Sequence, residues 1–175
     1  VSDDAPPYWA PASQTVEAAP EAEESYLLDS GDKIRVFIYG QPNLSRVYPI
    51  DGSGFIAMPL IGAVKARATT TYDLAANIAE LLQVSYVRDP EVSVEVASYR
   101  PFYILGEVRA AGQYPFVAGL TVEAAVAIAG GYGPRADKRG IEIVRVIDGV
   151  HTTIDVARAE PVRPGDTVQV RERFF

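Results

Sequence analysis

Apolar and polar residues alternate along several short segments of the chain, as in half-buried β-strands. Residues 33–38 read KIRVFI, and residues 91–96 read EVSVEV. A period of two places successive side chains on opposite faces of a sheet. We therefore expect a strand over each segment, with one buried face and one face in water.

Turn-forming residues separate the other predicted strands. The segment Asp51-Gly52-Ser53-Gly54 lies between apolar residues 47–50 and 55–58, which predicts a hairpin. Glycine permits positive φ there, and Asp51 can accept hydrogen bonds from the turn backbone. A short edge strand is expected at 62–64. Further strands are expected at 102–108, 113–117, 141–147, 150–156 and 167–171, with a tight turn at Asp148-Gly149.

Two segments have the period of an amphipathic helix. Within residues 69–86 the apolar positions form one stripe, and Thr70 or Thr71 can cap the N-terminus. A shorter helix is expected up to residue 129, with Thr121 as its cap and Gly130-Gly131 as its stop.

These elements predict an α+β fold built from two small mixed modules. Residues 26–98 form a β-sheet unit around one helix, and residues 99–175 form a second β-rich unit with the short helix. Residues 1–25 contain four prolines and six acids but no Lys or Arg, which predicts a flexible tail. One local element recurs: residues 30–36 resemble residues 164–170, and in both a Gly-Asp pair precedes an alternating strand.

Charge and composition exclude several functions. The net charge of −7 comes mainly from the tail, and the remainder is nearly neutral without a Lys/Arg run, so nucleic-acid binding is not expected. The absence of cysteine rules out disulfides and Cys-based metal sites within this sequence. No apolar run approaches the ~18–20 residues that span a bilayer as a helix. Because the chain begins at Val1, we expect a processed or trimmed product.

The residues that could carry chemistry have simpler explanations. His151, the single histidine, lies beside a predicted turn, and Glu91 and Glu95 share a wet strand face. Ser53 lacks the setting of a nucleophile, and the glycines around Tyr132 follow a helix rather than precede one. We therefore expect no catalytic residue, cofactor or metal. The expected turn residues are Gly31, Asp32, Asp51, Gly52, Gly54, Gly62, Gly106, Gly112, Gly130, Gly131, Gly165 and Asp166.

Tyrosines near strand ends are the candidates for binding. Their rings can stack on sugar faces or anchor protein interfaces, although packing within a core is the alternative explanation. The candidates for glycan or interface contacts are Tyr39, Tyr48, Tyr103, Tyr114 and Tyr132.

The ordered motifs of the first module resemble those of bacterial outer-membrane polysaccharide export proteins, which serve capsule and exopolysaccharide secretion. The matching residues are Tyr26, Leu28, Gly31-Asp32, Tyr39-Gly40, Asp51-Gly52-x-Gly54, Pro59-Leu60-Ile61-Gly62 and Asp89-Pro90-x-Val92. The second module resembles the β-grasp (SLBB) module that follows the export domain in that family. Its matching residues are Leu105-Gly106-Glu107-Val108, Gly112-Gln113-Tyr114, Thr121-Val122-Glu123-Ala124 and Ala129-Gly130-Gly131.

The resemblance implies a non-enzymatic subunit of a secretion complex. In that family, subunits form rings, commonly octamers, that enclose a conduit for polysaccharide and work with an inner-membrane polysaccharide copolymerase. It also implies a location in the periplasm, at the outer membrane of a Gram-negative bacterium.

Three departures from the family pattern qualify this expectation. The chain has one β-grasp module and no C-terminal pore helix, no N-terminal Cys for lipidation, and Ala111 where proline is usual. A short member is therefore expected to need a separate outer-membrane β-barrel. Two alternatives stay open: a monomeric periplasmic adaptor that binds glycan, and a carbohydrate-active enzyme.

Overall fold

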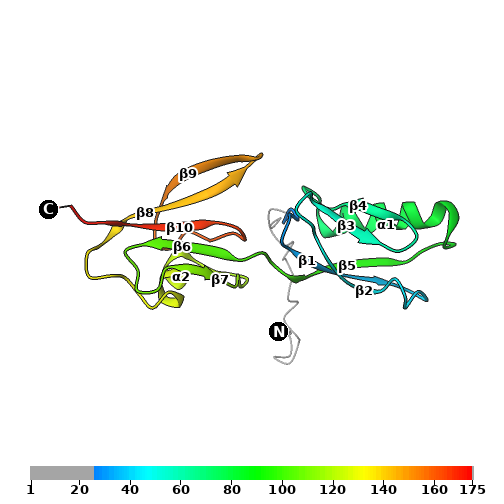
Figure 1. Cartoon of the computed structure of the whole chain (residues 1–175), viewed down its shortest axis with the longest axis horizontal. Helices are drawn as coiled ribbons and strands as arrows, with labels where there is room; N and C mark the ends of the chain where they lie inside the picture. The colour runs from blue at the N-terminus through cyan, green and yellow to red at the C-terminus, as the bar shows by residue number, and fades with distance from the viewer. Residues whose placement is uncertain (1–25, 175) are drawn as a thin grey trace, which may run out of the picture.

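The computed structural model describes residues 26–174 and has the expected α+β fold. Two domains lie end to end along the long axis of the molecule (Figure 1). Each has its own buried hydrophobic cluster, one built from residues 28–82 and the other from residues 102–170. The prediction of a flexible tail concerns residues 1–25, which lie outside the described residues.

The first domain packs one helix and two small sheets around a common core. The central strand, β1 (Lys33–Ile38), points Ile34, Val36 and Ile38 into this core, as the alternation predicts. The helix contributes Leu74, Ile78 and Leu82 to the same cluster. The other elements are β2 (Arg46–Pro49), β3 (Phe55–Met58), β4 (Gly62–Lys65), α1 (Thr71–Ser85) and β5 (Val92–Ser98).

The predicted hairpin between residues 47–50 and 55–58 is wrong. The turn at Asp51 exists, with the Asp51 N–H donating to the Phe55 carbonyl at 2.9 Å. However, β2 pairs with β1 in a sheet of order β2-β1-β5, whereas β3 pairs with β4. The chain therefore changes sheet at this turn. Alternation of apolar and polar residues is compatible with either pairing, so it does not select between them.

The second domain is a five-stranded sheet of order β7-β6-β10-β8-β9 with one short helix, a β-grasp arrangement. The neighbouring strands β6 and β10 are parallel, and every other pair is antiparallel. The helix buries Val122, Ala125 and Val126 in the core of this domain. The elements are β6 (Phe102–Gly106), β7 (Gly112–Tyr114), α2 (Val122–Ile128), β8 (Ala136–Ile147), β9 (Val150–Val156) and β10 (Thr167–Glu172).

Both helices begin at the expected threonines. The Thr70 hydroxyl accepts a hydrogen bond from the Asp73 N–H at 3.1 Å, and Thr121 does the same for Ala124 at 3.3 Å. A threonine oxygen at this position satisfies a backbone donor that the helix leaves unpaired. The caps therefore fix where each helix starts.

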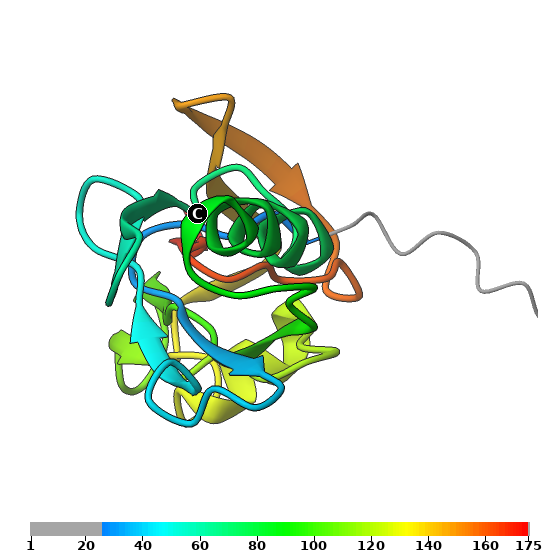
Figure 2. The same cartoon turned by 90° about the vertical axis from the view of Figure 1, so that its right-hand side faces the viewer.

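The β8–β9 hairpin extends beyond the sheet. Val144 is the last β8 residue that pairs with β10, opposite Thr167, and residues 145–147 pair only with β9. The turn has φ of 49° at Asp148 and 77° at Gly149, which the predicted Asp-Gly turn requires. In both Figure 1 and Figure 2 this hairpin rises clear of the rest of the second domain.

Candidate functional site

The two Gly-Asp pairs form the same turn in both domains. In Asp29–Asp32 and in Arg163–Asp166, the last N–H donates to the first carbonyl, at 3.2 and 3.1 Å. Each final carboxylate accepts the first N–H, at 3.0 and 2.7 Å. The glycine at the third position has φ of 94° in Gly31 and 82° in Gly165, as a type II turn requires. The sequence similarity therefore corresponds to a shared geometry.

Each turn places its carboxylate out of contact with water, and an arginine compensates the buried charge. Asp32 is 0% exposed and Asp166 is 1% exposed. Asp166 receives a two-point contact from Arg145, with Nε–Oδ1 at 3.0 Å and Nη2–Oδ2 at 2.7 Å. Asp32 is paired with Arg100, with Nη1–Oδ2 at 3.1 Å. A buried carboxylate is stable only with such partners.

Arg100 lies between the two turns and joins the domains. Its backbone N–H donates to Asp32 Oδ1 at 2.7 Å. A Cβ added at Gly31 would lie 3.2 Å from Arg100 Cβ, and one added at Gly165 would lie 2.7 Å from Arg100 Nε. The neighbouring Pro101 carbonyl accepts the Gly165 N–H at 3.0 Å. Because Gly31 and Gly165 have no Cβ, the Arg100 side chain can lie close against the backbone of both turns.

Aromatic rings continue this contact from one domain into the other. Tyr26 and Tyr99 meet edge to face with ring centroids 5.1 Å apart, and Tyr99 meets Phe116 at 5.4 Å. The Tyr26 hydroxyl donates to Asp32 Oδ2 at 2.7 Å and accepts from Arg100 Nη1 at 2.6 Å. Burial, and then the hydrogen bond to the Asp32 carboxylate, raises the pKa of Tyr26 far above its usual value.

A cavity of about 540 Å³ lies beside this junction and is lined by both domains. Its walls include Tyr26, Asp29, Arg100, Arg145 and Arg163. Its volume is in the range of small-molecule sites. However, Arg100 and Arg145 are engaged by the buried Asp32 and Asp166. The junction is therefore a structural joint that fixes the orientation of the domains.

Of the predicted turn glycines, Gly62, Gly106 and Gly112 are end residues of β4, β6 and β7, and the others lie in turns or bends. Every predicted turn glycine except Gly52 has positive φ. Asp51 ties the turn by accepting the N–H of Ser53 at 2.8 Å and of Phe55 at 3.0 Å. The glycines with positive φ are Gly31, Gly54, Gly62, Gly106, Gly112, Gly130, Gly131 and Gly165.

The structure separates the five candidate tyrosines by burial. Tyr48 is only 3% exposed and its hydroxyl donates to the Leu44 carbonyl, so its assignment as a surface contact is wrong. Tyr114 stacks on the buried Phe102 and donates to the Ala110 carbonyl, which makes it mainly a packing residue. Tyr39 is 73% exposed on the first domain, and Tyr103 is exposed on the second. Their contacts stay a prediction.

Tyr132 lies among charged groups at the outer end of the second domain. Its hydroxyl donates to Glu123 Oε2 at 2.9 Å, and the Lys138 ammonium lies 5.3 Å from its ring centroid. Partial burial, and then the hydrogen bond to Glu123, raises the pKa of Tyr132 to about 12. The neighbouring Arg158 acts in the opposite direction.

This pKa predicts a loss of stability in alkali. An unfolded tyrosine ionises near pH 10, whereas folded Tyr132 keeps its proton to about pH 12. The folded state binds the proton more tightly, so this contribution is complete below pH 10 and is lost as the pH rises through about 12. Urea unfolding across this range should show a smaller decline in Tyr132→Phe. An equal decline in both proteins would contradict the assignment.

Residues that could suggest catalysis are exposed or paired. The Glu95 carboxylate pairs with Arg35 of the adjacent strand at 2.8 Å, and His151 is exposed near the hairpin turn. Within residues 26–174, no three His, Cys, Asp or Glu side chains are grouped so as to hold a metal. None of the helices in this range has the length and apolar character needed to cross a bilayer.

The sequence did not predict the roles of Arg100 and Arg145 at the junction. Asp32 and Asp166 were expected only as turn residues, whereas each also binds a guanidinium. Arg100 directly precedes Pro101 at the boundary between the modules, which is a weak signal for its role. Arg145 lies within a strand, 21 residues before its partner, and carries no local signal.

Comparisons with known proteins agree with the two-domain arrangement. A family described as polysaccharide biosynthesis/export protein matches residues 20–97, and the SLBB domain family matches residues 101–155. A curated relative, the exopolysaccharide production protein ExoF of Rhizobium meliloti (strain 1021), is 41% identical over 90 residues. That match covers 50% of this chain and 21% of the relative.

Proposed function

Because the chain belongs to the polysaccharide biosynthesis/export protein family, with one export domain followed by one SLBB domain, we propose that it is a subunit of a complex that secretes capsular polysaccharide or exopolysaccharide. It acts by assembly rather than by catalysis. The observation that carries this proposal is the ordered pair of domains, held together by Arg100 between two Gly-Asp turns. A fixed angle between domains is what a repeating assembly requires of its subunit.

The proposed assembly is a ring of identical subunits in the periplasm, at the outer membrane of a Gram-negative bacterium. The ring encloses the path of the polysaccharide and meets an inner-membrane polysaccharide copolymerase on one side. A separate outer-membrane β-barrel completes the path. Exposed apolar side chains support self-association, because burying them against a neighbouring subunit removes apolar surface from water and lowers the free energy.

The β8–β9 hairpin is the surface that we assign to contact between copies. Val146, Ile147 and Val150 are exposed where the hairpin extends beyond β10, and Val150 is 63% exposed. A projecting tip with aliphatic side chains can insert into a neighbouring subunit and bury them there, whereas in an isolated monomer they stay exposed to water.

The proposal is tested by secretion. Deleting the gene in its own bacterium should abolish extracellular polysaccharide, and a plasmid copy should restore it. Normal secretion by the deleted strain would contradict the proposal.

Charges at the hairpin tip should prevent assembly. We expect Ile147→Asp combined with Val150→Asp to shift the protein from oligomer to monomer, because two carboxylates would have to be buried without partners. Light scattering and negative-stain images measure the change. The control, Asn43→Asp with Gln83→Glu, adds the same charge at exposed positions of the first domain. A monomeric unmodified protein at high concentration would instead favour the adaptor alternative.

A further inference from the structure

The end of the second domain opposite the junction carries a cluster of basic residues. Lys138, Arg139 and Arg173 line a hollow of about 640 Å³ together with Tyr132. Lys138, Arg139 and Arg158 line a second hollow of about 400 Å³. Because the two hollows share Lys138 and Arg139, they form one continuous surface. We call Tyr132, Lys138, Arg139, Arg158 and Arg173 the distal basic groove.

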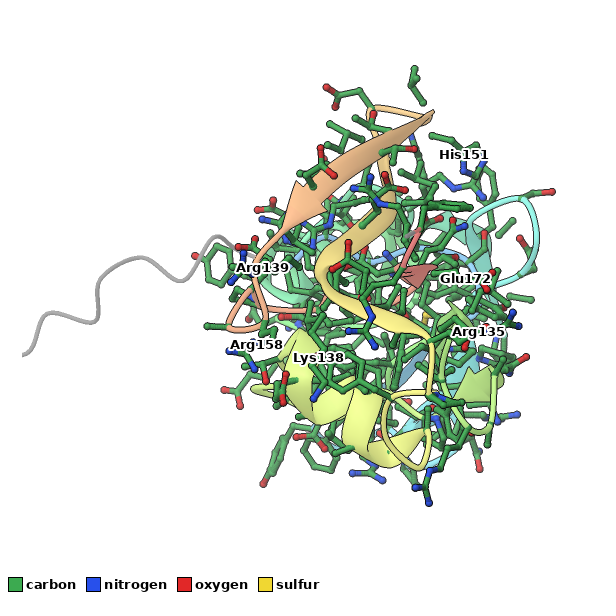
Figure 3. All side chains as sticks on the ribbon, turned by 90° about the vertical axis from the view of Figure 1, so that its left-hand side faces the viewer. Arg135, Lys138, Arg139, His151, Arg158 and Glu172 are labelled. Carbon is green, nitrogen blue, oxygen red and sulfur yellow. The ribbon has the colours of Figure 1, made fainter. Side chains whose placement is uncertain are left out.

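The groove is built from four separate segments of the chain, the fourth being Arg173 directly after β10. Tyr132 lies in the loop after α2, Lys138 and Arg139 lie at the start of β8, and Arg158 follows β9. Figure 3 shows Lys138, Arg139 and Arg158 together on one side of this end, with Arg135 beside Glu172 on the other. The sheet therefore gathers cations that are scattered in the sequence.

The cations of the groove are not neutralised by the described part of the chain. Arg135 pairs with Glu172 at 2.7 Å, and Arg171 pairs with Glu142 at 3.1 Å. By contrast, none of the four cations of the groove has a salt bridge to a carboxylate within residues 26–174. All four side chains are exposed at the surface.

The carboxylates nearest to the groove already have hydrogen-bond donors. Asp137 Oδ1 accepts the Arg139 backbone N–H at 3.0 Å, and Glu123 accepts the Tyr132 hydroxyl. Asp155 of the second hollow is bound by Arg171. The four cations of the groove outnumber the two carboxylates that line the hollows, Asp137 and Asp155, so the surplus charge at this surface is positive.

The side chains of the groove suit an acidic sugar polymer. A guanidinium binds a carboxylate through two parallel hydrogen bonds, and it keeps its charge at every physiological pH. An aromatic ring such as Tyr132 offers an apolar face on which a sugar ring can pack while hydroxyls find polar partners. Two adjoining hollows suit an extended chain with recurring acidic groups better than a single small anion.

We propose that the distal basic groove binds the exported polysaccharide and that this polymer is anionic, carrying carboxylate groups that Lys138, Arg139, Arg158 and Arg173 engage. This inference rests on the proposed function, because only an exporter subunit would meet the polymer. It adds the chemical class of the polymer and the surface that holds it.

Binding of polygalacturonate to the full chain tests the proposal, with dextran as the uncharged probe. Calorimetry at 0.1 M salt should detect polygalacturonate but not dextran. Lys138→Gln combined with Arg139→Gln and Arg158→Gln should weaken binding by about tenfold or more, because charge-assisted contacts are lost. The control, Lys33→Gln with Lys65→Gln and Arg88→Gln, removes the same charge from exposed positions of the first domain. It should change affinity by less than about twofold, since screening limits long-range effects to about 10 Å at 0.1 M salt.

Three results would overturn the proposal. Equal weakening in both triple variants would show that only net charge matters. Equal binding of dextran would show that the protein does not recognise the carboxylates of the polymer. Tighter binding of a peptide with the sequence of residues 1–25, which holds six acids, would identify an acidic peptide as the occupant.

Secretion assays separate this inference from the proposed function. If the gene is required for secretion but polygalacturonate does not bind, the anionic-polymer inference fails and the proposed function stands. If polygalacturonate binds as expected but the deleted strain secretes normally, the proposed function fails and the groove remains a polyanion site.

Discussion

Replacing Asp32 with alanine is expected to lower the free energy of unfolding by about 3–5 kcal/mol, the cost of breaking a buried ion pair. The carboxylate of Asp32 is inaccessible to water and accepts hydrogen bonds from the N–H groups of Asp29 and Arg100. It also accepts the Tyr26 hydroxyl and pairs with the Arg100 guanidinium. Alanine would leave these donors without an acceptor at the junction between the domains. Urea unfolding followed by circular dichroism measures the loss.

A matched control lies three residues earlier in the same turn. Asp29 pairs with Arg67 at 2.8 Å, but both side chains are partly exposed. Asp29→Ala should therefore cost only about 1 kcal/mol or less, as for other exposed ion pairs. Asp32→Asn, which keeps the shape but removes the charge, should fall between the two. Equal losses for Asp29→Ala and Asp32→Ala would contradict the assigned role of Asp32.

Loss of the junction should also be visible in the shape of the molecule. Arg100 is the side chain that contacts both Gly-Asp turns, so Arg100→Ala should leave each domain folded but free to reorient. Small-angle scattering would then report a broader range of dimensions than the unmodified chain gives. A subunit with a loose joint would present its surfaces at variable angles, which is incompatible with a closed ring.

Local signals in the sequence were sufficient for the elements of the fold. The period-two segments at 33–38 and 150–156, the Thr70 and Thr121 caps and the Asp148-Gly149 turn all depend on residues a few positions apart. Physical effects of this kind act within one turn or one strand. The sequence therefore predicts them without knowledge of the rest of the chain.

Local sequence patterns could not predict which distant segments pair with one another. The segment 46–49 pairs with β1 rather than with the segment after its turn, and the alternation within the segment does not reveal this partner. The partners of Asp32 and Asp166 lie 68 and 21 residues away. The distal basic groove likewise joins four segments that are separate in the sequence. A sequence without a Lys/Arg run can thus still form a basic surface.

Replacing Gly106 with alanine should be the most damaging single methyl addition in the second domain. Gly106 ends β6 with φ of 90°, and an added Cβ would lie 2.0 Å from the Val170 carbonyl oxygen. That oxygen accepts the Glu107 N–H at 3.0 Å in the central pairing of β6 with β10, so it cannot withdraw without breaking the sheet. Backbone strain and overpacking together should cost about 4 kcal/mol. Thermal unfolding measures the shift.

Gly131 separates the two causes of this cost. Its φ of 96° is close to that of Gly106, but a Cβ added there meets no atom within 4 Å. Gly131→Ala should therefore lose only about 1–2 kcal/mol, the strain of a left-handed backbone. The difference between the two variants is the steric term at the β6–β10 pair. If both variants lose the same stability, strain accounts for the whole effect and the tight approach of Val170 is not what requires glycine at position 106.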